Sequence, residues 1–194
     1  MKRIFLLITI CALTISCSKN DDDNLTEINN DGTGGISCLV DGKVLVSRGQ
    51  GSGIVPEVFG FANDDDIYFF ALRLSNRNSG FNNDKSMRIQ VYDVEYLNPT
   101  TFERLSLEGM TYQLGTFGDP NSYGEFQTYG HYSDNSLELG EYYTTEIING
   151  EITITFHDLE NYVIAGTFWF DAVNENGEII EIRDGRFDKV ITGL

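Results

Sequence analysis

The sequence predicts an all-β domain, an antiparallel two-sheet β-sandwich, that follows a signal peptide and a disordered stalk. From residue 36 onward, apolar and polar residues alternate with a period of two, which is the pattern of half-buried strands. β-Branched and aromatic residues dominate these runs, and Asn-Gly or Asp-Gly pairs separate several of them. A single β-barrel remains the alternative, because both architectures use short strands joined by tight turns.

Residues 1–16 have the organisation of a secretory signal peptide. Lys2 and Arg3 are basic, and the following run from Ile4 to Ser16 is apolar or small throughout. This run is too short to cross about 30 Å of hydrocarbon as a helix, which takes roughly 20 residues. We therefore exclude it from the expected fold.

The end of the leader suggests covalent lipidation. Thr14-Ile15-Ser16-Cys17 resembles the lipobox of bacterial lipoproteins, although Thr14 stands where that pattern usually has Leu. The resemblance implies that Cys17 carries the lipid, including palmitate, and becomes the new N-terminus. Two or more acyl chains on one residue give a stable membrane anchor.

Residues 17–35 are expected to form the lipidated N-terminus and a flexible acidic linker, because they contain few sizeable apolar residues. The acids at 21–23 resemble the export tag of Bacteroidota surface lipoproteins. That resemblance implies an outer-membrane protein exposed at the cell surface, with the periplasmic face of the membrane as the alternative. A solvated tether would also explain the acids.

Residues 36–194 have the length of one domain. The formal charge of −17 disfavours nucleic acid and anionic lipid as partners. Contact with the membrane is therefore expected through the lipid alone, which leaves a polysaccharide or a surface protein as possible partners. Cys38 lies in an apolar run and is expected to be a small buried hydrophobe.

The expected strands follow from the alternation and the turn pairs. Met87 to Tyr92 and Glu151 to His157 alternate strictly, whereas 67–74 and 167–173 are denser in apolar residues, as in central strands. On this pattern His157 continues a polar face and should meet solvent. The expected spans are 37–40, 43–47, 57–62, 67–75, 86–94, 111–115, 124–131, 141–148, 151–157, 163–173 and 178–190, the last broken near 184–185.

The C-terminal segment resembles a terminal hairpin that recurs in uncharacterised Bacteroidota lipoproteins. The resemblance lies in residues 166–170 (GTFWF), the Asn-Gly pair at 176–177 and residues 182–187 (IRDGRF). It implies a fold and a location but no chemistry. By alternation, Phe168 and Phe170 share one face, Trp169 lies on the other, and Phe187 can cap the core.

One candidate ligand site rests on aromatic residues. If Trp169 points outward, it could stack on a sugar ring, with Tyr129, Tyr132 and Tyr142 extending the platform. The competing interpretation, which we favour, is that these aromatic residues pack within the sheets.

Metal binding and catalysis have weaker support. Asp64, Asp65 and Asp66 offer oxygen ligands for Ca²⁺, but a solvated turn explains the acidic loop better, so no metal or other cofactor is expected. No catalytic motif is present. We expect a non-enzymatic, lipid-anchored binding or structural accessory module, with a glycan-binding module and a carboxylate-based hydrolase as alternatives.

Overall fold

The computed structural model describes residues 25–46, 58–62, 68–76, 85–92, 94–115 and 127–192. None of these residues forms a helix that is long and apolar enough to span a membrane. Eleven strands account for most of the described chain. They are β1 (Gly35–Val40), β2 (Lys43–Val46), β3 (Val58–Ala62), β4 (Tyr68–Asn76), β5 (Lys85–Tyr92), β6 (Thr111–Leu114), β7 (Tyr129–Asp134), β8 (Glu141–Tyr143), β9 (Gly150–Asp158), β10 (Val163–Val173) and β11 (Ile179–Val190).

The all-β prediction is confirmed, and every pairing between strands is antiparallel. Each expected span has a strand in the structure, and 163–173 coincides with β10. The largest differences are at β7, which begins at Tyr129 rather than at 124, and at β8, which ends at Tyr143 rather than at 148.

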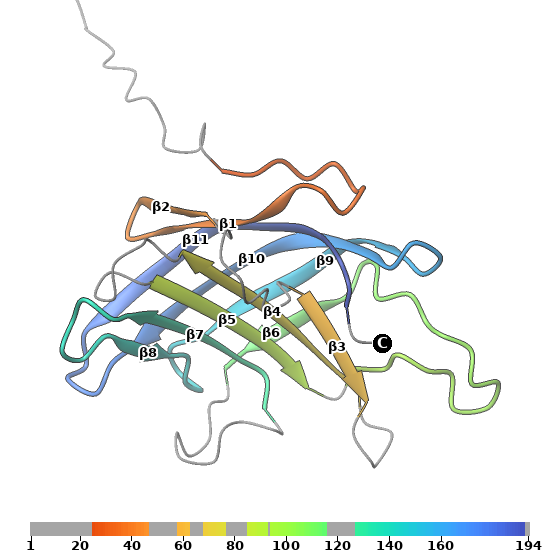
Figure 1. Ribbon diagram of the computed structural model, residues 1–194. Coiled ribbons are helices and arrows are strands. Elements are labelled where there is room, and N and C mark those ends of the chain that lie inside the picture. The colour runs from red at the N-terminus through yellow and green to blue at the C-terminus, as the bar shows by residue number, and fades with distance from the viewer. Residues whose placement is uncertain are drawn as a thin grey trace, which may run out of the picture.

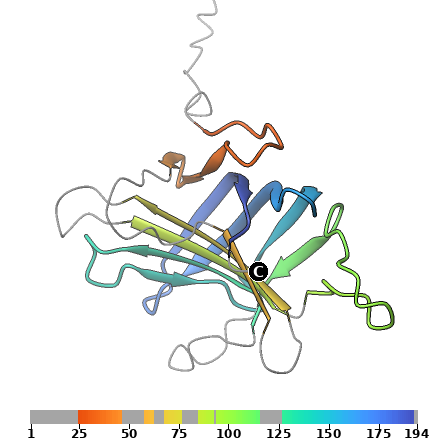
Figure 2. The ribbon, with the colours of Figure 1, turned by 45° about the vertical axis from the view of Figure 1, so that its right-hand side comes forward.

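The two-sheet sandwich is wrong, because one hydrogen-bonded sheet runs through the whole fold. Its main path is β2-β1-β11-β10-β8-β7-β5-β4-β3, and β9 and β6 branch from β10. The long strand β10 causes the continuity: one edge pairs with β11, and the other pairs first with β9 and then, at Val173, with β8. Figures 1 and 2 show the resulting curl, with β9, β10 and β11 in one wall and β4, β5 and β7 in the other. In the described residues the path ends at β2 and β3, so this curled sheet is an open half-barrel.

The concave side of the curled sheet holds the apolar core. Phe168 and Phe170 are buried there, whereas Trp169 is 38% exposed on the opposite face, so the alternation predicted for this strand is confirmed. Phe187 is fully buried in the same core, as expected. Cys38 is also fully buried and free, and burial raises the pKa of its thiol to about 12. Burying one large apolar side chain contributes roughly 1.5–3 kcal/mol.

The turn chemistry is confirmed in part. Asp41 and Gly42 both have positive φ (46° and 74°), as the type I′ turn between β1 and β2 requires. At Asn176-Gly177 only the glycine has positive φ, and the Asn174 side chain organises the turn by accepting hydrogen bonds from two backbone N–H groups. Asp184 also has positive φ (51°), but it lies within β11, where it forms part of a bulge rather than a hairpin turn.

His157 is buried, and the expectation that it would face solvent is wrong. The pairing between β9 and β10 shifts register between Ala165 and Gly166, which inserts one extra residue into β9 after Ile154. Such a bulge reverses the alternation beyond it. His157 therefore points inward at 6% exposure, where its Nδ1 accepts a hydrogen bond of 2.9 Å from the Leu107 backbone N–H.

His157 should make stability depend on pH. Burial lowers its pKa below the ordinary 6.5, so below that pH the unfolded chain binds a proton that the folded chain does not. We expect stability to fall by up to about 1.4 kcal/mol per pH unit as the pH drops from about 6.5 toward the folded pKa. Urea unfolding at a series of pH values between about 7.5 and 5.5 measures this slope.

The matched variant is His157→Asn. The Asn Oδ1 can still accept the Leu107 N–H bond, but the side chain cannot take up a proton. The variant should lose most of the slope in this pH window, and a slope equal to that of the parent protein would contradict the assignment.

Residues 25–34 are docked on the sheet, and the expectation of a flexible linker up to residue 35 is wrong for them. The Asp188 carboxylate is fully buried on β11 and accepts three backbone hydrogen bonds, from Asn29, Asn30 (both 2.7 Å) and Gly32 (2.8 Å). Thr26 also donates its backbone N–H to the Ser37 hydroxyl on β1. Figure 1 shows this segment, in red-orange, lying against β1. Composition could not reveal the docking, because the carboxylate that holds the loop lies more than 150 residues further along the chain.

Candidate functional site

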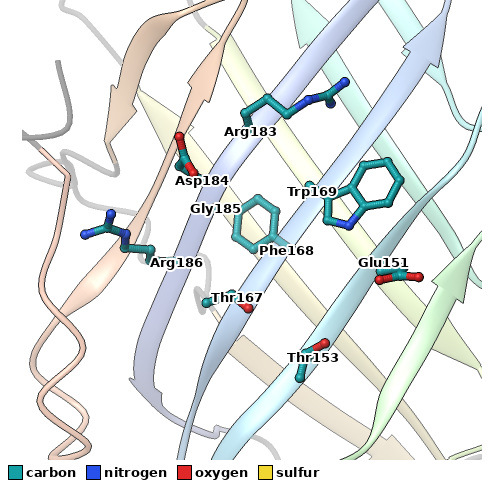
Figure 3. A pocket seen from close by; sticks show the side chains of 9 residues that line it. All are labelled: Glu151, Thr153, Thr167, Phe168, Trp169, Arg183, Asp184, Gly185 and Arg186. Carbon is teal, nitrogen blue, oxygen red and sulfur yellow. The ribbon is translucent and has the colours of Figure 1, made fainter. Parts of the chain in front are cut away.

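A groove of about 440 Å³ reaches across β9, β10 and β11 around Trp169. We call it the outer-face groove. Figure 3 shows the Trp169 indole face-on, with the Glu151 side chain below it and the Arg183 side chain above it. The lining residues are Glu151, Thr153, Thr167, Phe168, Trp169, Arg183, Asp184, Gly185 and Arg186.

The pairing register brings these side chains together as two rows. In the first row, Thr111, Thr153, Thr167 and Arg186 are successive cross-strand partners on β6, β9, β10 and β11. The hydroxyls of Thr111 and Thr153 lie 3.0 Å apart and share a hydrogen bond. This row presents polar hydroxyl and guanidinium groups on one face of the sheet, because directly paired residues point to the same face.

The second row lies beside the first and contains the indole. Gln113, Glu151 and Trp169 are cross-strand partners on β6, β9 and β10. Gln113 Nε2 donates a hydrogen bond of 2.8 Å to Glu151 Oε1, which fixes that carboxylate beside the groove. An aromatic face is thereby bordered by hydrogen-bonding groups.

A β-bulge completes the groove on the β11 side. The register between β10 and β11 shifts from Phe168–Gly185 to Phe170–Ile182, so two residues, Arg183 and Asp184, lie opposite Trp169. Bulges redirect side chains in this way. Gly185, the cross-strand partner of Phe168, leaves room for the Phe168 ring to pack against its backbone, and both residues line the groove.

Arg183 holds the indole in place. Its guanidinium lies over the Trp169 ring, 5.6 Å from the ring centroid. Nη2 forms an ion pair of 2.6 Å with Asp171 Oδ1, and Nη1 donates to the carbonyl oxygens of Phe170 (3.2 Å) and Ile182 (2.9 Å). Because the guanidinium is itself fixed on three sides, it restricts the orientation of the ring and lowers the entropy that ligand binding would cost.

The predicted aromatic platform is reduced to one residue. Tyr129, Tyr132 and Tyr142 are buried, at 5%, 2% and 4% exposure, so the exposure that the platform required of them is absent. Tyr132 and Tyr142 pack against each other in the core, with ring centroids 6.1 Å apart. The pKa values of the Tyr129 and Tyr132 hydroxyls are raised, mainly because these side chains are buried. Trp169 is the member of the set that remains available to a ligand.

Two sets of predicted residues lie outside the described part of the chain. These are the lipidation site Cys17 and the possible calcium ligands Asp64, Asp65 and Asp66. Within the described ranges, no group of three or more His, Cys, Asp and Glu side chains is arranged to hold a metal ion.

Sequence reasoning missed the residues that surround Trp169, especially Arg183, Asp184 and Arg186. The Asp-Gly pair at 184–185 predicts a break in the strand, but a glycine inside a strand pattern also signals a bulge. No sequence feature indicated that the bulge would lie opposite Trp169, since that depends on the register of β10 against β11.

A second polar cluster, on β7 and β8, contains the residue types of a hydrolytic triad. His131 Nε2 and Glu141 Oε2 are 2.5 Å apart, and the Ser133 hydroxyl donates 2.6 Å to the other oxygen of Glu141. The serine is thus bonded to the acid and not to the histidine, whereas a nucleophilic serine needs a base as its partner. The pKa of Glu141 is lowered, mainly by the hydrogen bond from His131.

The fold and the groove together define a class: an all-β domain with an open, aromatic-centred groove on the convex face of a single curled sheet. A family model described as "Domain of unknown function (DUF6252)" matches residues 73–191, which is more than half of the chain and includes the whole outer-face groove. The chain therefore belongs to the DUF6252 family. No curated protein matched. No solved structure matched either.

Proposed function

We propose that this protein is a non-enzymatic, lipid-anchored surface module that binds glycans through the outer-face groove. The single observation that carries the proposal is the 38% exposed indole of Trp169, held by Arg183 and bordered by hydroxyl, carboxylate and guanidinium groups. A sugar ring has an apolar face that can stack on an aromatic ring, and its hydroxyls both donate and accept hydrogen bonds. The groove offers partners for both parts of such a ligand.

Four of the described carboxyl groups have electrostatics that disfavour the role of an acid catalyst. A carboxylate-based hydrolase needs one carboxyl group whose pKa is raised, so that it can donate a proton near neutral pH. Hydrogen bonds from Thr33 and Asn161 lower the pKa of Asp31 and Asp158, respectively. The pKa values of Glu141 and Asp134 are also lowered, in Asp134 by hydrogen bonds that outweigh its burial.

A purely structural role is the alternative to ligand binding. A structural accessory would gain nothing from an exposed indole that is held rigidly, whereas a binding site gains affinity from a pre-organised aromatic anchor. The Arg183–Trp169 arrangement therefore supports binding over that alternative.

The glycan proposal predicts a large effect for Trp169→Ala. Because the chain has one tryptophan, its fluorescence reports on the groove alone. Titration of the protein with a panel of soluble polysaccharides should give a saturable change with at least one of them. In calorimetry, Trp169→Ala should weaken that binding by about 2 kcal/mol or more, roughly 30-fold.

Ile147→Ala is the matched control, since Ile147 is 90% exposed and lies outside the groove. It should bind as the parent protein does. Equal loss of binding in both variants, or unchanged binding in Trp169→Ala, would contradict the assignment of the site.

The anchor has its own test. If Cys17 is acylated and the protein is held at the outer membrane, cells that express it should incorporate labelled palmitate into the chain, and Cys17→Ser should not be labelled. Protease treatment of intact cells should then degrade the parent protein if the domain is surface-exposed. Labelling that persists in Cys17→Ser would refute the lipidation site, and protection from protease would favour the periplasmic face.

A further inference from the structure

The formal charges that line the outer-face groove cancel. Two carboxylates, Glu151 and Asp184, oppose two guanidinium groups, Arg183 and Arg186. The charge of Arg183 is already compensated by its ion pair with Asp171. Arg186 remains as the guanidinium available to a ligand, since no ion pair or hydrogen bond to another described residue engages it. The groove thus has no excess of positive charge.

The protein around the groove is strongly acidic. Its formal charge is −17 and its isoelectric point is about 4.2. At physiological salt, charges interact over roughly 8 Å, so the charges within the groove dominate the local potential. An anionic ligand would exchange its water shell for one free guanidinium and two carboxylates of its own sign.

The polar groups of the groove suit hydroxyls better than carboxylates or sulfates. Thr153 and Thr167 offer groups that donate and accept, Glu151 and Asp184 only accept, and Arg186 only donates. A hydroxyl can satisfy every one of these groups because it both donates and accepts. A carboxylate can use only the donors, and it leaves the two acids facing a like charge.

We infer that the groove selects neutral saccharides and discriminates against uronates and sulfated sugars. This inference rests on the proposed glycan-binding function and specifies its ligand class. Trp169 supplies the stacking surface, Glu151 and Asp184 accept from sugar hydroxyls, and Arg186 donates to them. The two carboxylates provide the selectivity, because repulsion of the wrong ligand contributes to specificity as much as attraction of the right one.

The test compares neutral and acidic oligosaccharides of equal length with the full chain. The neutral set contains gluco-, xylo- and manno-oligosaccharides, and the acidic set contains oligogalacturonate and oligomannuronate. Trp169 fluorescence is titrated at about 20 mM and about 500 mM NaCl, which span weak and strong screening. We expect saturable binding of at least one neutral ligand, with Kd nearly independent of salt, and affinity for the acidic ligands at least tenfold lower at low salt.

The outcomes separate the inference from the function on which it rests. Tighter binding of an acidic ligand, weakened by salt, would overturn the inference but retain a glycan-binding groove. A fluorescence signal that no saccharide of either set changes would overturn the proposed function itself.

A double variant tests the mechanism of selectivity. Glu151→Gln combined with Asp184→Asn removes both carboxylates while keeping the side-chain shapes, and Asn tolerates the positive φ at position 184. The ratio of acidic to neutral affinity should rise at least tenfold. Glu160→Gln, an exposed carboxylate outside the groove, should leave that ratio unchanged, and an unchanged ratio in the double variant would refute the assigned role.

Discussion

Replacing Asp188 with alanine is expected to lower the free energy of unfolding by about 3 to 5 kcal/mol, the upper range for a single substitution. The carboxylate is fully buried and accepts three hydrogen bonds of 2.7–2.8 Å from the backbone of residues 29–32. Bonds to a charged group contribute about 1.5–3 kcal/mol each, but the freed loop recovers part of this by binding water. The midpoint of urea unfolding measures the loss.

Two further variants separate the loss of stability caused by removing the Asp188 carboxylate from the general effects of a mutation. Asp188→Asn keeps the size but turns one acceptor into a donor that faces backbone N–H groups, so we expect a smaller loss of about 2 kcal/mol. Asp31→Ala changes an exposed acid of the same loop, whose carboxylate accepts hydrogen bonds from Thr33, and should cost less than about 1 kcal/mol. Equal losses in Asp188→Ala and Asp31→Ala would show that Asp188 does not hold the segment.

Release of this segment would also change the proposed tether. With residues 25–34 docked, eight residues (17–24) separate the proposed lipid at Cys17 from the described fold. Such a stretch spans at most about 29 Å, which would keep the domain near the membrane. In Asp188→Ala the tether would lengthen, because residues 25–34 would no longer be held on the sheet. Increased proteolysis between residues 25 and 34 would report this release.

The second large effect is expected for Gly185→Ala, which should destabilise the domain by about 2 to 3 kcal/mol and reshape the floor of the groove. A Cβ at this position would lie 2.3 Å from Cδ2 and Cε2 of the Phe168 ring, which is 3% exposed and packed in the core. The ring must shift, or the two strands must separate. Urea unfolding measures the destabilisation, and the emission of the neighbouring Trp169 should change with the altered packing.

Gly115→Ala is the matched control. The nearest atoms to a Cβ at that position are at ordinary contact distances of 3.5 and 3.6 Å, and the backbone there is not left-handed. The substitution should be neutral, or slightly stabilising because the unfolded chain loses freedom. If Gly185→Ala were as stable as Gly115→Ala, the close packing of Phe168 on Gly185 would be refuted.

The sequence predicted most of the secondary structure, because strand formation leaves a local signal. The alternation through Phe168, Trp169 and Phe170 placed each side chain on its correct face. The alternation failed at His157, because one extra residue in β9 reversed which side chains of that strand face the core. Nothing in the residues 151–157 themselves indicates that bulge, because it appears only when β9 is aligned against β10.

The candidate site, too, could be predicted from the sequence only in part. Trp169 could be singled out from the sequence, since it is the one tryptophan and lies opposite the core face of its strand. Tyr129, Tyr132 and Tyr142 could not be excluded, because tyrosines in strands are common on both faces. Arg183, Asp184 and Arg186 became part of the site only through the bulge that places them beside the indole.

The sequence by itself determined that the domain is all-β, that its strands are antiparallel, and which residues of β10 face the core. These properties depend on neighbours along the chain, through side-chain period and turn chemistry. The tertiary structure alone decided that there is one curled sheet rather than two, that Asp188 binds the loop at 29–32, and that a groove surrounds Trp169. Each of these depends on how separate segments of the chain are aligned against one another, and the register of the strands is fixed by the packing of the whole sheet.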